Sequence, residues 1–168
     1  MTTNEVQELR EGQPAPDFTV PAIGPDTIVK NGQVHLADLK GRVVVLYFYP
    51  KDDTPGCTAE ACAFRDANQE MQQRGVAVLG VSTDSLASHQ KFAEKYGLPF
   101  TLLADTDKVV AQAYNVYKEK SMFGKKYMGV ERATFLIDKE GVIRKIWPKV
   151  KPDGHAAQVL QTIEALNL

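Results

Sequence analysis

Two cysteines, Cys57 and Cys62, lie within the segment YPKDDTPGCTAEAC at residues 49–62, between an apolar run and a helix-like pattern. The first amides of a helix have no intrahelical partner and carry the positive end of the helix dipole, so a cysteine there is stabilised as the thiolate. Because the thiolate is the nucleophilic form, the position predicts that Cys57 is a nucleophile. Thr54 offers a hydroxyl that can donate to the sulfur or accept and orient a substrate proton, and Pro50 stiffens the loop that holds both.

The expected location also bears on the cysteine pair. Residues 1–18 are interrupted by charged side chains and hold no apolar run of signal-peptide length, so we expect a cytoplasmic protein. In a reducing compartment, a pair of cysteines is more often redox-active or metal-binding than a structural disulfide. The longest apolar stretch, residues 43–49, is far shorter than the roughly 20 residues that cross a bilayer, and no membrane association is expected.

Composition narrows the class of protein further. The chain of 168 residues is 43% hydrophobic, which suits one domain, residues 1–168, with a substantial core. Its 20 basic and 21 acidic residues nearly cancel, and the lysines and arginines are spread along the chain. No nucleic-acid partner is therefore expected, since such binding needs concentrated positive charge.

The elements that must position the cysteines follow from the hydrophobic pattern. Continuous apolar runs predict buried strands, and apolar positions three and four residues apart predict helices. The expected order is strand 43–49, helix 58–74, strand 76–81, helix 85–96, strand 100–103, helix 105–114, hairpin 133–137 with 142–147, and helix 155–166. This order predicts a mixed sheet with helices on both faces, an α/β thioredoxin-like sandwich.

Two segments do not fit a regular pattern. Residues 13–33 are rich in proline and glycine and are expected to be extended and turn-rich. Residues 115–131 contain two glycines and a cluster of lysines and are expected to form a loop or an irregular extension, with the lysines solvated.

The sequence resembles the peroxiredoxins, whose active-site motif Pro-x-x-x-Thr-x-x-Cys is matched by Pro50, Thr54 and Cys57. Segments of similar appearance recur in the family's order over nearly the whole chain, at residues 15–18, 80–85 and 134–138. Within that superfamily the sequence is most similar to the bacterioferritin comigratory protein, or peroxiredoxin Q, subgroup, because Cys62 follows Cys57 by five residues.

The resemblance implies a thiol peroxidase that reduces hydroperoxides to water or alcohols through a sulfenic acid on Cys57. It also implies that Cys62 is the resolving cysteine of an intramolecular disulfide, that thioredoxin is the reductant, and that the protein is a monomer. The family's active-site arginine maps onto Arg132. Two plainer interpretations stay open, in which Cys62 is a bystander thiol and Arg132 an ordinary surface cation. No bound cofactor is expected, since two sulfurs can hold the electrons.

A thioredoxin-like dithiol-disulfide oxidoreductase is the nearest alternative, because it would share the fold and a cysteine at a helix start. Such enzymes use Cys-x-x-Cys, whereas here four residues separate the cysteines, and Arg132 stands near the place of their cis-proline. A metal-binding or interaction module is a second alternative. Zinc prefers four ligands, and the three histidines, His35, His89 and His155, are far apart in the sequence and are expected to be surface or capping residues, so no metal is expected.

Overall fold

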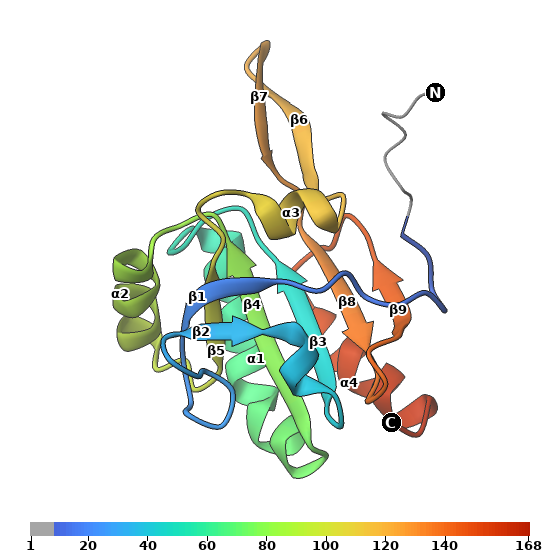
Figure 1. The fold of residues 1–168 in the computed structure, drawn as a ribbon. Helices are drawn as coiled ribbons and strands as arrows, with labels where there is room; N and C mark the ends of the chain where they lie inside the picture. Colours follow the sequence, from blue (N-terminus) through green and yellow to red (C-terminus); the bar gives the residue numbers. More distant parts are fainter. Residues whose placement is uncertain (1–8) are drawn as a thin grey trace.

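The computed structural model describes residues 9–168, which are built around a seven-stranded sheet with the order β2-β1-β5-β4-β3-β8-β9 (Figure 1). Residues 1–8, part of the stretch expected to lack a signal peptide, lie outside the described residues. Strands β3, β4 and β5 run parallel to one another, and the other pairs are antiparallel. The strands are β1 Thr19–Ile23, β2 Gln33–His35, β3 Val43–Phe48, β4 Val76–Ser82, β5 Thr101–Ala104, β8 Ala133–Ile137 and β9 Ile143–Trp147. The predicted mixed sheet and thioredoxin-like sandwich are confirmed.

Both faces of this sheet are covered. The helices are α1 Pro55–Gln73, α2 Leu86–Tyr96, α3 Val109–Ala113 and α4 His155–Ala165, with a 3-10 helix, η1, at Leu36–Leu39. Side chains of α1, α2 and α4 pack in one core, whereas η1, α3 and the N-terminal segment pack in the other. All six residues of β3 are buried, with Val45 and Tyr47 in the first core and Leu46 and Phe48 in the second. The uninterrupted apolar run of β3 is thus explained by burial on both faces.

The prediction for residues 13–33 was incomplete, because β1 lies inside that segment. Val20 and Ala22 alternate with exposed residues and point into the core. Pro21 pairs with Gln33 of β2 but has no pairing partner in β5. Proline cannot donate a ladder hydrogen bond, and it is tolerated here because one side of β1 is unpaired at this position. A proline in the middle of a segment argues against a strand, so the alternation of buried and exposed residues was not recognised.

The prediction of a loop or an irregular extension at residues 115–131 was wrong, because most of this segment is regular strand. Strands β6, Tyr117–Met122, and β7, Lys125–Val130, form a hairpin that is a separate two-stranded sheet and projects from the body (Figure 1). Its turn residues Phe123 and Gly124 have φ of 53° and 78°, as a tight hairpin turn requires. Because neither face is buried, polar side chains occupy both faces and the sequence lacks the usual alternation of a strand.

The described residues contain no helix that is both long and apolar enough to span a bilayer.

Candidate active site

The position of Cys57 is set by the start of α1. Thr54 is the N-cap, with extended backbone angles, and Pro55 occupies the first turn, where a missing amide hydrogen costs nothing. The helix therefore begins three residues before the expected Thr58. Cys57 lies in the first turn and is 1% exposed, so its sulfur is held among the unpaired amides at the positive end of the helix.

Arg132 reaches Cys57 from the connection between two strands. It lies directly between β7 and β8, and β8 pairs with β3 so that Ala133 faces Phe48 at the end of the sheet where the active-site loop begins. The Arg132 Nη2 donates to the Cys57 Sγ at 3.3 Å. Gly56 leaves room for this approach, since a Cβ there would lie 3.1 Å from Nη2. The structure thus brings together two residues that are 75 positions apart in the sequence.

Glu60 completes this group and was not predicted from the sequence. Its Oε1 accepts from the Arg132 Nη1 at 2.7 Å, and its side chain is 1% exposed. Burial raises the pKa of Glu60 to about 7, although the Arg132 guanidinium acts in the opposite direction. Among the described residues, the other carboxylate oxygen has no hydrogen-bond partner. The signal was present in the sequence, because Glu60 is one helical turn after Cys57, on the face that also carries apolar residues.

Tyr47, on β3, is close enough to Cys57, Glu60 and Arg132 to interact with them electrostatically. Its hydroxyl is buried and likewise has no partner within residues 9–168. Burial raises the pKa of Tyr47, and the negative charges of Glu60 and Cys57 raise it further. Tyr47 therefore stays a neutral phenol beneath the charged groups.

Thr54 and Pro50 belong to the loop between β3 and α1, as expected. The Thr54 hydroxyl donates to the carbonyl oxygen of Lys51 at 2.9 Å. Its proton is therefore engaged, and of the two roles considered for Thr54 the structure is compatible with the acceptor role. The oxygen lone pairs remain available to a substrate O–H.

Cys62 lies further along α1, half-buried, and both cysteines are free thiols. Residues five apart on an ideal helix have Cα atoms roughly 9 Å apart on different faces. A disulfide tolerates at most about 7 Å, so Cys57 and Cys62 do not bond in this conformation.

The hairpin borders the site as well. Lys120 of β6 is within electrostatic range of Arg132 and Cys57. Burial lowers the pKa of Lys120, and the positive charge of Arg132 lowers it further. The lysine cluster was expected to be simply solvated, but Lys120 is half-buried and interacts electrostatically with Arg132 and Cys57.

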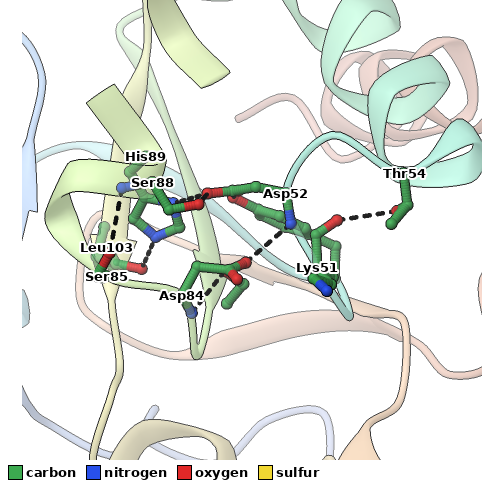
Figure 2. A network of polar contacts seen from close by, with 10 residues as sticks. Lys51, Asp52, Thr54, Asp84, Ser85, Ser88, His89 and Leu103 are labelled. Carbon is green, nitrogen blue, oxygen red and sulfur yellow. Dashed lines mark hydrogen bonds and ion pairs between the residues drawn. The ribbon is translucent and has the colours of Figure 1, made fainter. Parts of the chain in front are cut away.

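A second polar cluster lies at the loop that joins β3 to α1 and contains Asp52, Asp84 and His89 (Figure 2). Their ligand atoms lie within 4.8 Å of one another and are of types that bind metals. Each of them already has hydrogen-bond partners in the protein. His89 is fully buried and His155 is 3% exposed. Their rings bond Asp52, Leu103, Thr134 and Gln158 and cap no helix, so the expectation that they are surface or capping residues was wrong for both.

The comparisons with known proteins show the family to which the chain belongs. Residues 11–146 match the model of the AhpC/TSA family. Peroxiredoxin Bcp of Bacillus subtilis is 49% identical over 156 residues, covering 93% of this chain and 96% of that protein. Peroxiredoxin Bcp of Escherichia coli K12 is 42% identical, with the same coverage of 93% and 96%.

Solved structures give the same result. Peroxiredoxin Q of Xanthomonas campestris superimposes with a TM-score of 0.79 at 41% identity, over 88% of this chain and 90% of that one. A mutant of PrxQ from Xylella fastidiosa gives 0.86 at 34% identity, over 96% and 99%. The chain belongs to the AhpC/TSA family. It is a peroxiredoxin, an enzyme that reduces a hydroperoxide at the expense of a thiol, and its similarity is to the Bcp and peroxiredoxin Q members.

Proposed function

We propose that Cys57 is the residue that attacks the hydroperoxide, with Thr54 and Arg132 acting on the transition state and Pro50 fixing the loop. The observation that carries this assignment is the 3.3 Å contact between Arg132 Nη2 and Cys57 Sγ at the start of α1. An attacking sulfur needs to be ionised, and the charge that develops on the departing oxygen needs a fixed donor. This group of side chains meets both needs.

The chemical step follows from the roles of these atoms. The Cys57 thiolate attacks the terminal peroxide oxygen, an S–O bond forms, and the O–O bond breaks with its electron pair going to the leaving oxygen. That oxygen takes up a proton and departs as water or an alcohol, while Cys57 becomes a sulfenic acid. The Arg132 guanidinium stabilises the developing negative charge, and Thr54 accepts a hydrogen bond from the peroxide O–H.

Cys62 is the proposed resolving residue. Its thiolate attacks the sulfenic sulfur of Cys57, a disulfide forms, and the sulfenic oxygen leaves as water after protonation. The 55–73 helix separates the two sulfurs, so the turn between them opens before this step. A dithiol protein of the thioredoxin type then reduces the disulfide.

The proposal also covers the oligomeric state of the enzyme, its location and its need for a cofactor. Cys57, Thr54, Glu60 and Arg132 are all supplied by one chain, which supports a monomeric enzyme formed by residues 1–168 as one peroxiredoxin domain. The proposed disulfide must be reduced again in every cycle by a dithiol protein, which supports a location in a reducing compartment, the cytoplasm. The two cysteines carry the electrons, so the proposed cycle uses no bound cofactor.

The test couples peroxide consumption to thioredoxin, thioredoxin reductase and NADPH, with hydrogen peroxide and cumene hydroperoxide as substrates. NADPH oxidation that requires both peroxide and thioredoxin supports the proposal, and the two substrates reveal the preference of the site. Reduction of insulin disulfides without peroxide turnover would instead favour a dithiol-disulfide oxidoreductase.

A further inference from the structure

One peptide group connects the proposed active site to the polar cluster beside it. The peptide between Lys51 and Asp52 donates its N–H to Asp84 Oδ2 at 2.8 Å, and its carbonyl accepts the Thr54 hydroxyl at 2.9 Å (Figure 2). The N–H and C=O of a trans peptide lie in one plane and point in opposite directions. Fixing the N–H side therefore also fixes the direction in which the carbonyl meets Thr54.

Asp84 is itself held in place. Ser82, at the end of β4, donates its hydroxyl to the same Oδ2 at 2.6 Å, and the Asp84 amide donates to the Ser82 hydroxyl at 3.2 Å. Ser82 is 1% exposed. The carboxylate is thus anchored to the central sheet, which is a more rigid support than a loop.

The Asp52 side chain provides a second anchor for the same peptide. Its carboxylate receives the Tyr49 hydroxyl at 2.6 Å and the Ser88 hydroxyl at 2.8 Å, and it lies 2.7 Å from His89 Nδ1. His89 Nε2 lies 2.8 Å from the carbonyl oxygen of Leu103, which can only accept, so Nε2 carries a hydrogen. Asp52 is 7% exposed, so the loop is tied to α2 and β5 by buried contacts.

We propose that Asp84 is a positioning residue for peroxide reduction, acting through the Lys51–Asp52 peptide group on the Thr54 hydroxyl. This inference rests on the proposed role of Thr54 as an acceptor for the peroxide O–H. With its proton on the Lys51 carbonyl, Thr54 presents lone pairs to the substrate. Without Asp84 the N–H of this peptide loses its acceptor, so the direction of the Lys51 carbonyl is no longer fixed, although the Asp52 side chain still anchors the loop. The Thr54 hydroxyl then turns its proton to the Cys57 thiolate. That bond stabilises the ground state and removes the acceptor needed in the transition state.

The measurement is the second-order rate constant for oxidation of Cys57 by hydrogen peroxide, in a single turnover. Asp84→Ala should lower it by about 10-fold or more, a smaller loss than the roughly 100-fold for removal of a donor that touches the transition state, because Asp84 acts through Thr54. Asp84→Asn keeps an oxygen that accepts from the Asp52 amide and should recover most of the rate. Lys95→Ala breaks another contact between this loop and α2, the 2.8 Å bond to Asp53, and should leave the rate within about 2-fold.

A double-mutant cycle separates positioning from a general structural effect. In a Thr54→Val background there is no hydroxyl to orient, so adding Asp84→Ala should change the rate by less than about 2-fold. Alkylation of Cys57 by iodoacetamide, which does not use the peroxide acceptor, should stay within about 2-fold of wild type in Asp84→Ala.

Four results would overturn the inference. An unchanged rate in Asp84→Ala, or an equal loss in the presence and absence of the Thr54 hydroxyl, shows that Asp84 does not act through Thr54. A parallel loss of alkylation and peroxide rates shows disruption of the loop instead. If Thr54→Val alone keeps the wild-type rate, the proposed role of Thr54 is wrong, and the inference falls with it.

Discussion

The guanidinium of Arg132 bridges Cys57 and Glu60, with Nη2 3.3 Å from the Cys57 sulfur and Nη1 2.7 Å from the Glu60 carboxylate. Because the guanidinium is planar and rigid, its bond to the Glu60 carboxylate also fixes the direction of the N–H group that points to Cys57. Arg132 Nη2 is thereby aimed at the Cys57 sulfur.

Ionisation of the sulfur alone gives little acceleration. An unperturbed thiol with a pKa of about 8.5 is ~3% ionised at neutral pH, so complete ionisation gains at most about 30-fold. For thiols in general, each unit by which the pKa falls also costs roughly 0.4–0.5 of a decade in intrinsic nucleophilicity. Most of the acceleration must therefore come from groups that stabilise the transition state.

Arg132→Lys tests this role. The variant keeps the charge but loses the fork geometry, so the rate constant of the fully ionised Cys57 with peroxide should fall by about 10-fold or more. Stopped-flow measurement at a pH that ionises the thiol in both proteins makes the comparison. Arg74→Lys, at the far end of α1 where Arg74 bonds Glu164, is the matched control and should leave the rate unchanged. An unchanged rate in Arg132→Lys would show that the arginine acts only on ionisation.

Glu60 should make folding stability depend on pH. Its pKa is about 7 in the folded protein and 4.5 ordinarily, so the folded state binds the proton more tightly. The stability gained from that proton is fully present below pH 4.5 and is lost as the pH rises through 7. The shift corresponds to about 3 kcal/mol, since one pKa unit is about 1.4 kcal/mol.

Glu60→Gln removes this dependence. The difference in free energy of unfolding, variant minus wild type, should therefore rise by about 3 kcal/mol between pH 4 and pH 8, as measured by urea denaturation. Glu70→Gln, an exposed residue on the same helix, is the control. A difference that does not change with pH would show that Glu60 stays ionised in the folded protein.

The sequence was sufficient to predict the fold and the class of enzyme. Strand β3 and helix α1 were recognisable because apolar residues follow their periods, and the motif around Cys57 and Thr54 lies at their junction. Glu60, Asp52 and His89 were not predicted as parts of the site. A single carboxyl or imidazole in a sequence does not reveal that it is buried, because burial is decided by partners such as Arg132 that are distant in the chain.

The hairpin was missed for a different reason. Its strands bury neither face, so no core imposes the alternation by which strands are recognised. Phe123, at the tip, is 97% exposed, although its residue type suggests a core position.

Cys62→Ser tests the proposed resolving step. Each opened turn of α1 costs a few hydrogen bonds at ~1 kcal/mol each, so opening after oxidation is energetically accessible. The variant should oxidise at the wild-type rate for one turnover but lose thioredoxin-dependent recycling. Undiminished recycling would identify an external thiol as the resolving partner.

Amide exchange tests the accompanying opening of the helix. In the wild-type protein, residues 58–66 should exchange slowly when reduced and rapidly once the disulfide has formed, while α2 stays protected in both states and serves as the internal control. A structure of the oxidised protein with α1 unbroken from Cys57 through Cys62 would contradict this account.

The most direct test of the central claim is the rate of peroxide consumption by Cys57→Ser, with dithiothreitol as a reductant that needs no protein partner. Cys57→Ser should be inactive, whereas Cys62→Ser should still react and should carry a sulfenic acid on Cys57 that can be trapped with dimedone and located by mass spectrometry. If Cys57→Ser keeps even about a tenth of the wild-type rate, a loss of only about 1.4 kcal/mol in transition-state stabilisation, Cys57 is not the nucleophile.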